Sequence, residues 1–368
     1  MPHAHSKTMA EARSAQKAIG KLVTRCRSLD ATLQSKPVSM RVTRFIDRNT
    51  RILTIGSCFA HELQIHLKRK GFNLLGSEIT NQFLWYNTFS ILYEFERITG
   101  EFGQTPEDCW EQSADKFSAE TLGGNPPAGN RIFQDPYRAY LYGNSREELW
   151  HATTVINDFL RNAIATADVL VVTLGLTEVW FEPHHGRVVC GVPGKEHGNS
   201  RVRESATAEG VGVIGGEPRD HRGQARFRFS GYEENFANMQ RVVEILQTVN
   251  PACRLIVTTS PVPLTRTFSE CDHVVANAES KSILRAVAGA LARKYEHVDY
   301  FPSYEMVVYS DRNLVFQEDG QHVDRDYVTQ IMQQFEQHFV AEEAASHETP
   351  RPHFPLGRLG QPTVREHH

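Results

Sequence analysis

Residues 51–60 read Arg-Ile-Leu-Thr-Ile-Gly-Ser-Cys-Phe-Ala, and this stretch decides the fold. Its first half, residues 51–55, is a short apolar run that predicts a strand, and Gly56 breaks that run. After the glycine the apolar residues return with the four-residue spacing of a helix, at Phe59, Leu63 and Leu67. The stretch therefore predicts a strand, a tight turn and a helix.

The same alternation of strand and helix continues along the chain. Further apolar runs lie at 169–174, 255–259 and 298–301, and each follows a helical pattern, at 147–167, 232–249 and 279–295 respectively. Gly71 is placed as the C-cap of the first helix, residues 72–75 can form a further strand, and a last helix is expected at 325–340. Continuous Val/Ile/Leu strands separated by helices indicate a parallel sheet that is buried on both faces. We therefore expect a three-layer α/β/α sandwich with a central parallel sheet.

One domain over residues 48–340 accounts for this pattern. Residues 1–47 are expected to form an N-terminal arm, with a basic amphipathic helix at about 7–29, and residues 341–368 are expected to be a disordered tail. Two long polar segments, about 100–144 and 183–230, are expected to be loop insertions that cover one end of the sheet.

Composition and charge exclude several classes of function. The 368 residues carry 40 Lys and Arg against 44 Asp and Glu, so no cationic excess is present to bind nucleic acid or an anionic membrane surface. The six cysteines lack CxxC spacing, which argues against a zinc ribbon or a disulfide scaffold and favours reduced thiols. No apolar run is long enough to span a bilayer, and the first 30 residues lack the apolar region of a secretory signal. A cytoplasmic protein without a metal or cofactor is expected.

Ser57 is the first candidate for chemistry. A serine at a strand-to-helix turn lies at the carboxyl edge of a parallel sheet, beside the positive end of the helix, and Gly56 permits the close approach of a substrate carbonyl. The alternative is that Ser57 only caps the helix. The adjacent Cys58 is a second candidate nucleophile, but neighbouring side chains at such a turn point apart, and a free cysteine is more often a buried thiol.

A serine nucleophile needs a base, and residues 318–322, Glu-Asp-Gly-Gln-His, offer one. Asp319 and His322 are three residues apart in a turn, so the carboxylate can orient the imidazole. This turn follows the last strand and precedes the final helix. Because the first and last strand-to-helix turns of a parallel sheet share its carboxyl edge, Ser57 and His322 are expected to converge there.

Residues 56–60, Gly-Ser-Cys-Phe-Ala, also match the signature after which the GSCFA family is named, and this chain resembles that family, which is related to the SGNH (GDSL-like) hydrolases. Other stretches agree with the resemblance over about residues 48–340: 86–88, 135–138, 173–180, 259–263, 277 with 280–282, 300–305, and 318–319 with 322.

The resemblance implies an SGNH-type fold with Ser57 as nucleophile, His322 as general base and Asp319 as the group that orients it. In SGNH enzymes the oxyanion hole comes from the N–H of the nucleophile, a glycine after the second strand and the asparagine of a Gly-x-Asn motif. Here Gly175-Leu176-Thr177 places threonine in the third position, and Gly76, Asn81 or Asn87 are candidates for the second. The candidate oxyanion and substrate residues are Gly56, Cys58, Asn87, Gly175, Thr177 and Glu178.

These observations predict a serine esterase or O-acyltransferase that acts on an acyl ester of a carbohydrate or similar polar metabolite. A non-catalytic glycan- or partner-binding module on the same fold is the alternative, and the oligomeric state stays open. Four other signals point to structure rather than to function. Residues 210–215 spell GxGxxG without the flanking strand and helix, and His184-His185 with His197 and Glu182 have no standard metal spacing. Residues 226–229 alternate charge and aromatics as an edge strand would, and Arg138 is expected to pair with Asp135.

Overall fold

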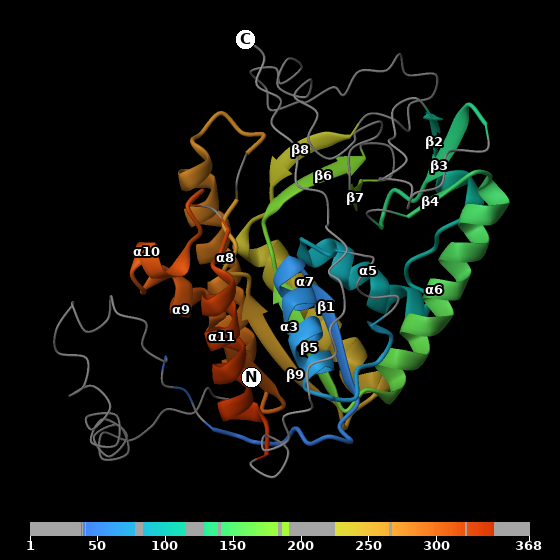
Figure 1. Cartoon of the computed structure of the whole chain (residues 1–368). Helices are drawn as coiled ribbons and strands as arrows, with labels where there is room; N and C mark the ends of the chain where they lie inside the picture. The colour runs from blue at the N-terminus through green and yellow to red at the C-terminus, as the bar shows by residue number, and fades with distance from the viewer. Residues whose placement is uncertain are drawn as a thin grey trace, which may run out of the picture.

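A computed structural model of the chain, shown in Figure 1, describes residues 38, 40, 42–77, 84–114, 129–138, 141–182, 186–190, 225–264, 267–320 and 322–341. The expected helix at 7–29, the tail beyond residue 341, the GxGxxG stretch at 210–215, the histidines at 184, 185 and 197, and Asn81 lie outside these residues.

A parallel sheet of four strands forms the centre of the molecule. Its strands are β1 (Ile52–Gly56), β5 (Val169–Leu174), β9 (Arg254–Thr259) and β10 (Val298–Phe301), in the order β1-β5-β9-β10. All three pairings are parallel, and the register of the first places Gly56 opposite Thr173. The expected α/β class with a central parallel sheet is therefore confirmed.

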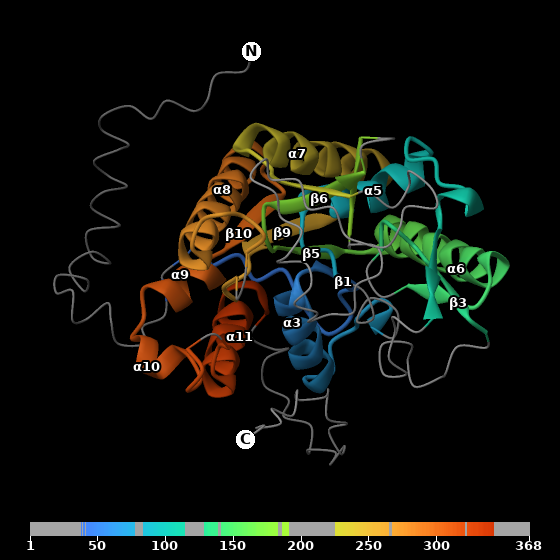
Figure 2. The same ribbon diagram turned by 90° about the horizontal axis from the view of Figure 1, so that it is seen from above.

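Helices cover both faces of this sheet, as the view from above in Figure 2 shows. One face is covered by α5 (Thr88–Thr99), α6 (Arg146–Thr166), α7 (Tyr232–Val249) and α8 (His273–Lys294). The other face is covered by α3 (Cys58–Arg69), α9 (Ser303–Val308), α10 (Arg312–Val315) and α11 (Arg325–Phe339). Alternate residues of each strand supply the two cores: Leu53 and Ile55 of β1 pack in the first, and Ile52 packs in the second. This is the three-layer arrangement that the sequence predicts.

The two polar segments are more than loops, because each contributes to a small antiparallel sheet. The first segment contains the short 3-10 helix η1 (Pro106–Asp108), β2 (Trp110–Ser113), β3 (Arg131–Gln134) and β4 (Tyr142–Gly143). The second sheet comprises β6 (Glu178–Glu182), β7 (Arg187–Val189) and β8 (Arg226–Phe229), in the order β7-β6-β8. β6 begins four residues after β5 ends, so this sheet lies beyond the carboxyl end of the central one (Figure 1). The expectation of a strand at 226–229 is confirmed.

Two local expectations were wrong. Residues 72–75 form no strand: Leu74 makes a single parallel bridge to Ile52, and the chain turns away at Gly76, where φ is 59°. The helix expected from residue 279 begins at His273, because the side chain of Asp272 caps it by accepting a hydrogen bond from the Val274 main chain at 2.8 Å. In the part of the chain that the structure describes, no helix combines the length and apolarity that a bilayer crossing requires.

Candidate active site

The turn after β1 is a tight main-chain junction. Gly56 has φ of 132°, and a Cβ there would lie 2.2 Å from the Thr173 carbonyl oxygen, so only glycine fits. The Ser57 N–H donates to that same oxygen at 3.1 Å, and the Trp85 N–H donates to the Gly56 carbonyl at 2.9 Å. These bonds fix the main chain on which the Ser57 side chain stands.

The Ser57 hydroxyl is buried and makes no hydrogen bond with the described residues. Ser57 occupies the N-cap position of α3 and is 1% exposed, but its side chain makes no capping hydrogen bond. Among the described residues Oγ has no hydrogen-bond partner at all, so the capping alternative is not realised. The residue borders a cavity of about 10 Å³, room for about one water molecule, which His61, Gln64 and Trp85 also line. A buried hydroxyl without a structural bond is free to react or to bind.

Asp319 and His322 form the pair that the sequence predicts. The Asp319 carboxylate lies 2.5 Å from Nδ1 of His322 and also accepts a hydrogen bond from the His322 main-chain N–H at 3.0 Å. The turn is closed by the Gln317 N–H, which donates to the His322 carbonyl at 2.8 Å, and by Gly320 with φ of 67°. Because Nδ1 is held by the carboxylate, Nε2 is the ring nitrogen that remains for a further partner.

Packing of α3 against α11 brings this pair to the same end of the molecule as Ser57. α3 begins directly after Ser57, and α11 begins three residues after His322. The two helices share one core and are joined by a hydrogen bond between His66 and Glu336 (Figures 1 and 2). Each helix returns from the carboxyl edge of the sheet, so both N-terminal ends lie at that edge.

The predicted contact between Ser57 and His322 is not made in this structure. The His322 side chain is 65% exposed, and Ser57 Oγ has no partner among the described residues. The bond between Asp319 and His322 is thus formed, whereas the bond from His322 to the serine is not. For the three groups to act together, the ring of His322 would have to turn inward.

Most main-chain donors expected in the oxyanion hole are already used. The Ser57 N–H bonds Thr173, the Gly175 N–H donates to the Tyr86 carbonyl at 3.1 Å, and the Thr177 N–H donates to Ser280 Oγ at 2.8 Å. The expectation that the N–H of Ser57 serves the oxyanion is therefore wrong, because the parallel ladder extends one residue past β1. By contrast, Oγ1 of Thr177 is buried and has no partner among the described residues.

The remaining candidate residues have mixed surroundings. Asn87 Oδ1 caps α5 by accepting from the Ser90 N–H at 2.9 Å, which leaves its amide nitrogen for a ligand. Glu178 accepts a hydrogen bond from Thr267, and burial raises the pKa of its carboxyl. Gly76 packs against the ring of Phe159. Burial also raises the pKa of the Cys58 thiol, which favours the protonated, unreactive form.

Lys281 is a functional candidate to which the sequence analysis gave no role. It lies in the third turn of α8, is 2% exposed, and its Nζ donates to the Gly175 carbonyl at 2.7 Å. Burial lowers the pKa of this ammonium to about 8, and Cys58 opposes the shift. A signal was present: Lys281 occupies the helix face that continues with Leu284, Ala288 and Leu291, where an apolar residue is expected.

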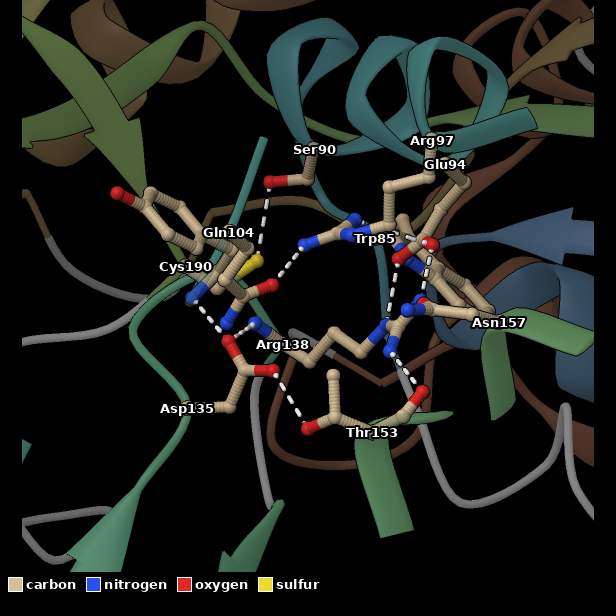
Figure 3. A network of polar contacts seen from close by, with 11 residues as sticks. Trp85, Ser90, Glu94, Arg97, Gln104, Asp135, Arg138, Thr153, Asn157 and Cys190 are labelled. Atoms are coloured by element: carbon tan, nitrogen blue, oxygen red, sulfur yellow. Dashed lines mark hydrogen bonds and ion pairs between the residues drawn. The ribbon is translucent and has the colours of Figure 1, made fainter. Parts of the chain in front are cut away.

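A buried network of polar side chains, drawn in Figure 3, packs next to the turn that carries Ser57. Glu94 on α5 accepts two hydrogen bonds from Arg138, at 2.9 and 2.6 Å, and one from Trp85 Nε1 at 2.9 Å, and it lies 3.1 Å from Arg97. Burial alone would raise the pKa of Glu94, but the two arginines and these hydrogen bonds outweigh it and hold the pKa at about 2. Since the main chain of Trp85 bonds Gly56, this network anchors the Ser57 turn.

This network corrects the expected pairing of Arg138 with Asp135. The side chain of Arg138 pairs with Glu94. Among the described residues, Asp135 accepts hydrogen bonds from the main chain of Tyr137 and Arg138, at 2.8 and 3.3 Å, and from the Thr153 hydroxyl at 3.5 Å. Glu94 was inconspicuous in the sequence because it lies within the pattern of an ordinary amphipathic helix.

Together, the parallel sheet, the Gly-Ser turn after its first strand and the Asp-His pair before its last helix define an α/β protein with a serine site at its carboxyl edge. A model of the GSCFA family matches residues 51–335, well over half of the chain, and the protein belongs to that family. A comparison with curated proteins found no match. In the described residues no group of three or more His, Cys, Asp or Glu side chains is arranged to hold a metal ion.

Proposed function

We propose that the protein is a serine esterase or O-acyltransferase, with Ser57 as nucleophile, His322 as general base and Asp319 as the orienting group. The observation that carries the proposal is the Ser57 hydroxyl, buried at the strand-to-helix turn and free of any structural hydrogen bond with the described residues. The preformed pair of Asp319 and His322 at the same edge of the sheet adds the base that such a hydroxyl needs.

In the proposed reaction, His322 turns inward while its Nδ1 stays on Asp319, and Nε2 removes the proton from Ser57. Oγ then bonds to the ester carbonyl carbon, and the carbonyl electron pair moves to its oxygen. When the tetrahedral intermediate collapses, the bond to the leaving alcohol breaks and His322 gives that oxygen its proton. Water or a second hydroxyl releases the acyl group from Ser57, which gives hydrolysis or transfer.

The small space at Ser57 supports a short acyl group, and the resemblance of the Gly-Ser-Cys-Phe-Ala signature to SGNH hydrolases supports an ester substrate. A short acyl group on a carbohydrate or similar polar metabolite is the substrate that we propose. The absence of cationic excess argues against a nucleic-acid partner.

The exposed ring of His322 favours a second candidate, a glycan- or partner-binding module that keeps the fold without the reaction. In that case the Asp319–His322 turn would serve as a polar surface rather than as a base. The two candidates differ in whether Ser57 is chemically activated.

The deciding experiment is the hydrolysis of p-nitrophenyl acetate, combined with labelling by a fluorophosphonate and mass-spectrometric mapping of the adduct. We expect wild type to react at Ser57, Ser57→Ala to be inert, and the exposed serine variant Ser282→Ala to match wild type. A folded wild-type protein that neither hydrolyses the ester nor carries the label would overturn the esterase proposal and favour the binding module.

A further inference from the structure

Lys281 is a buried cation whose surroundings do not balance its charge. Among the described residues its one hydrogen bond goes to the Gly175 carbonyl, and no carboxylate lies within 4 Å of Nζ. Arg138, which is equally buried, is paired with Glu94. Because an uncompensated buried charge costs several kcal/mol, its retention indicates a role for the charge itself.

The position of Lys281 relates it to Ser57. Gly56 and Thr173 are opposite each other in the β1–β5 ladder. Gly175, which directly follows β5, therefore lies near the turn that follows β1. The Ser57 N–H bonds the Thr173 carbonyl, and the carbonyl of Gly175, two residues further along, accepts from Nζ of Lys281 at 2.7 Å. The charge is also close enough to Cys58, the residue after Ser57, to act on its pKa.

The same edge lacks the usual main-chain donors, since the N–H groups of Ser57, Gly175 and Thr177 are all bonded within the protein. Besides the amide nitrogen of Asn87, two further side-chain donors remain there among the described residues. The Thr177 hydroxyl is buried without a partner among the described residues, and the ammonium of Lys281 has two protons beyond the one on Gly175. The positive end of α3, a helix of 12 residues that begins at Cys58, adds to the field.

We propose that Lys281, assisted by the Thr177 hydroxyl, stabilises the oxyanion that forms when Ser57 attacks an ester. This inference rests on the proposed function. The ammonium keeps its proton throughout: the carbonyl electron pair moves to oxygen, the proton of Ser57 goes to His322, and Lys281 contributes its charge and a hydrogen bond. A charged donor in a site that excludes water is well suited to this task.

The rate of reaction at Ser57 should depend on the charge of Lys281 and therefore on pH. Because burial lowers the pKa of Lys281 to about 8, its charge is present at pH 7 and is lost as the pH rises through that value. The reaction at Ser57 should therefore slow above about pH 8. Cys58 is the titratable group that acts directly on Lys281, and Glu62, one turn along α3, acts on Cys58. Neither group replaces the lost positive charge.

The test measures the rate of fluorophosphonate labelling at Ser57 between pH 6 and pH 10. We expect Lys281→Met to label about 10²–10³ times more slowly than wild type at pH 7 and to lose the decline near pH 8. Lys281→Arg should move that decline to much higher pH, because an arginine keeps its charge. Lys294→Met, at the exposed end of the same helix, should match wild type.

Circular dichroism establishes whether each variant is folded. If Lys281→Met does not fold, Thr177→Val tests the same site, and we expect it to label more slowly than wild type. A folded Lys281→Met protein that labels at the wild-type rate with the decline intact would overturn the inference. If wild type itself carries no label, the proposed esterase function fails while the anion site is still testable. In that case the ¹³Cε resonance of Lys281 is titrated with and without methylphosphonate. A pKa that rises with the anion supports the site, and an unchanged pKa refutes it.

Discussion

The carbonyl oxygen of Thr173 lies so close to Gly56 that a Cβ at position 56 would come within 2.2 Å of it. The same oxygen accepts the Ser57 N–H, so the two strands are joined at the residue that precedes the proposed nucleophile. The site and the central sheet consequently share one structural junction, and changes there should affect both.

Gly56→Ala is expected to destabilise the protein and to remove reactivity at Ser57. An alanine at position 56 would clash with the Thr173 carbonyl and would have to adopt a strained φ of 132°. The free energy of unfolding should therefore fall by about 3 kcal/mol or more. Gly100→Ala is the matched control: it also has a positive φ, 79°, but open space around it, and should cost about 1 kcal/mol. Urea denaturation measures both values, and equal losses for the two variants would contradict the role of the junction.

Arg138→Met is expected to be strongly destabilising because it leaves Glu94 buried beside a single arginine. Breaking one side of a buried ion pair typically costs about 3–5 kcal/mol. The control is Arg161→Met, which removes an exposed pair with Asp158 and should change stability by less than about 0.5 kcal/mol. Since the Glu94 network holds Trp85, Arg138→Met should also slow labelling at Ser57. A variant as stable as Arg161→Met would show that the network is dispensable.

Glu94 should make the fold sensitive to acid. Its folded-state pKa of about 2 lies below the ordinary value of 4.5, so its contribution is complete above pH 4.5 and is lost as the pH falls toward 2. The contribution at neutral pH is about 3 kcal/mol. Glu94→Gln lacks this titration, so the stability difference between wild type and the variant should shrink over that interval. Denaturation at pH 6, 4 and 3 measures it, and a constant difference would refute the assignment.

Asp319→Asn is expected to lower kcat of ester hydrolysis by about 10²–10⁴ while KM changes little. The neutral amide neither stabilises the imidazolium nor fixes the ring tautomer that leaves Nε2 to Ser57. Asp158→Asn, an exposed carboxylate on α6, serves as control. Steady-state kinetics on both variants measure the effect. An unchanged kcat would remove Asp319 from the reaction and leave the carboxylate as a turn-forming residue only.

The sequence predicted the layers well because their signals are local and strong. The apolar run at 169–174 is buried along its whole length and forms β5 with those bounds. The region 72–75 has similar composition but pairs at one residue only, because a turn cuts it short, and turns of this kind depend on main-chain geometry that composition does not encode. Apart from the strand at 226–229, the two small sheets were missed because polar, glycine-rich segments resemble loops.

For the site, the sequence indicated the pairing of Asp319 with His322 but not the direction in which the histidine ring points. The pair of Asp319 and His322 follows from their spacing, whereas the outward ring of His322 depends on packing. The burial of Lys281 and Glu94 depends on tertiary contacts between helices that are distant in sequence. Of the two, only Lys281 can be noticed in the sequence, because it places a charge in an otherwise apolar face of a helix.

The packing of α11 on α3 joins segments that are made at very different times during synthesis. Ile46, shortly before β1, makes a parallel β-bridge to Val340, the residue that follows α11. During synthesis, the amino-terminal portion leaves the ribosome many seconds before α11 exists, given about 5–20 residues per second. A nascent chain therefore carries its serine without its histidine. If Ser57 and His322 act together as proposed, a chain can react only after translation has passed α11.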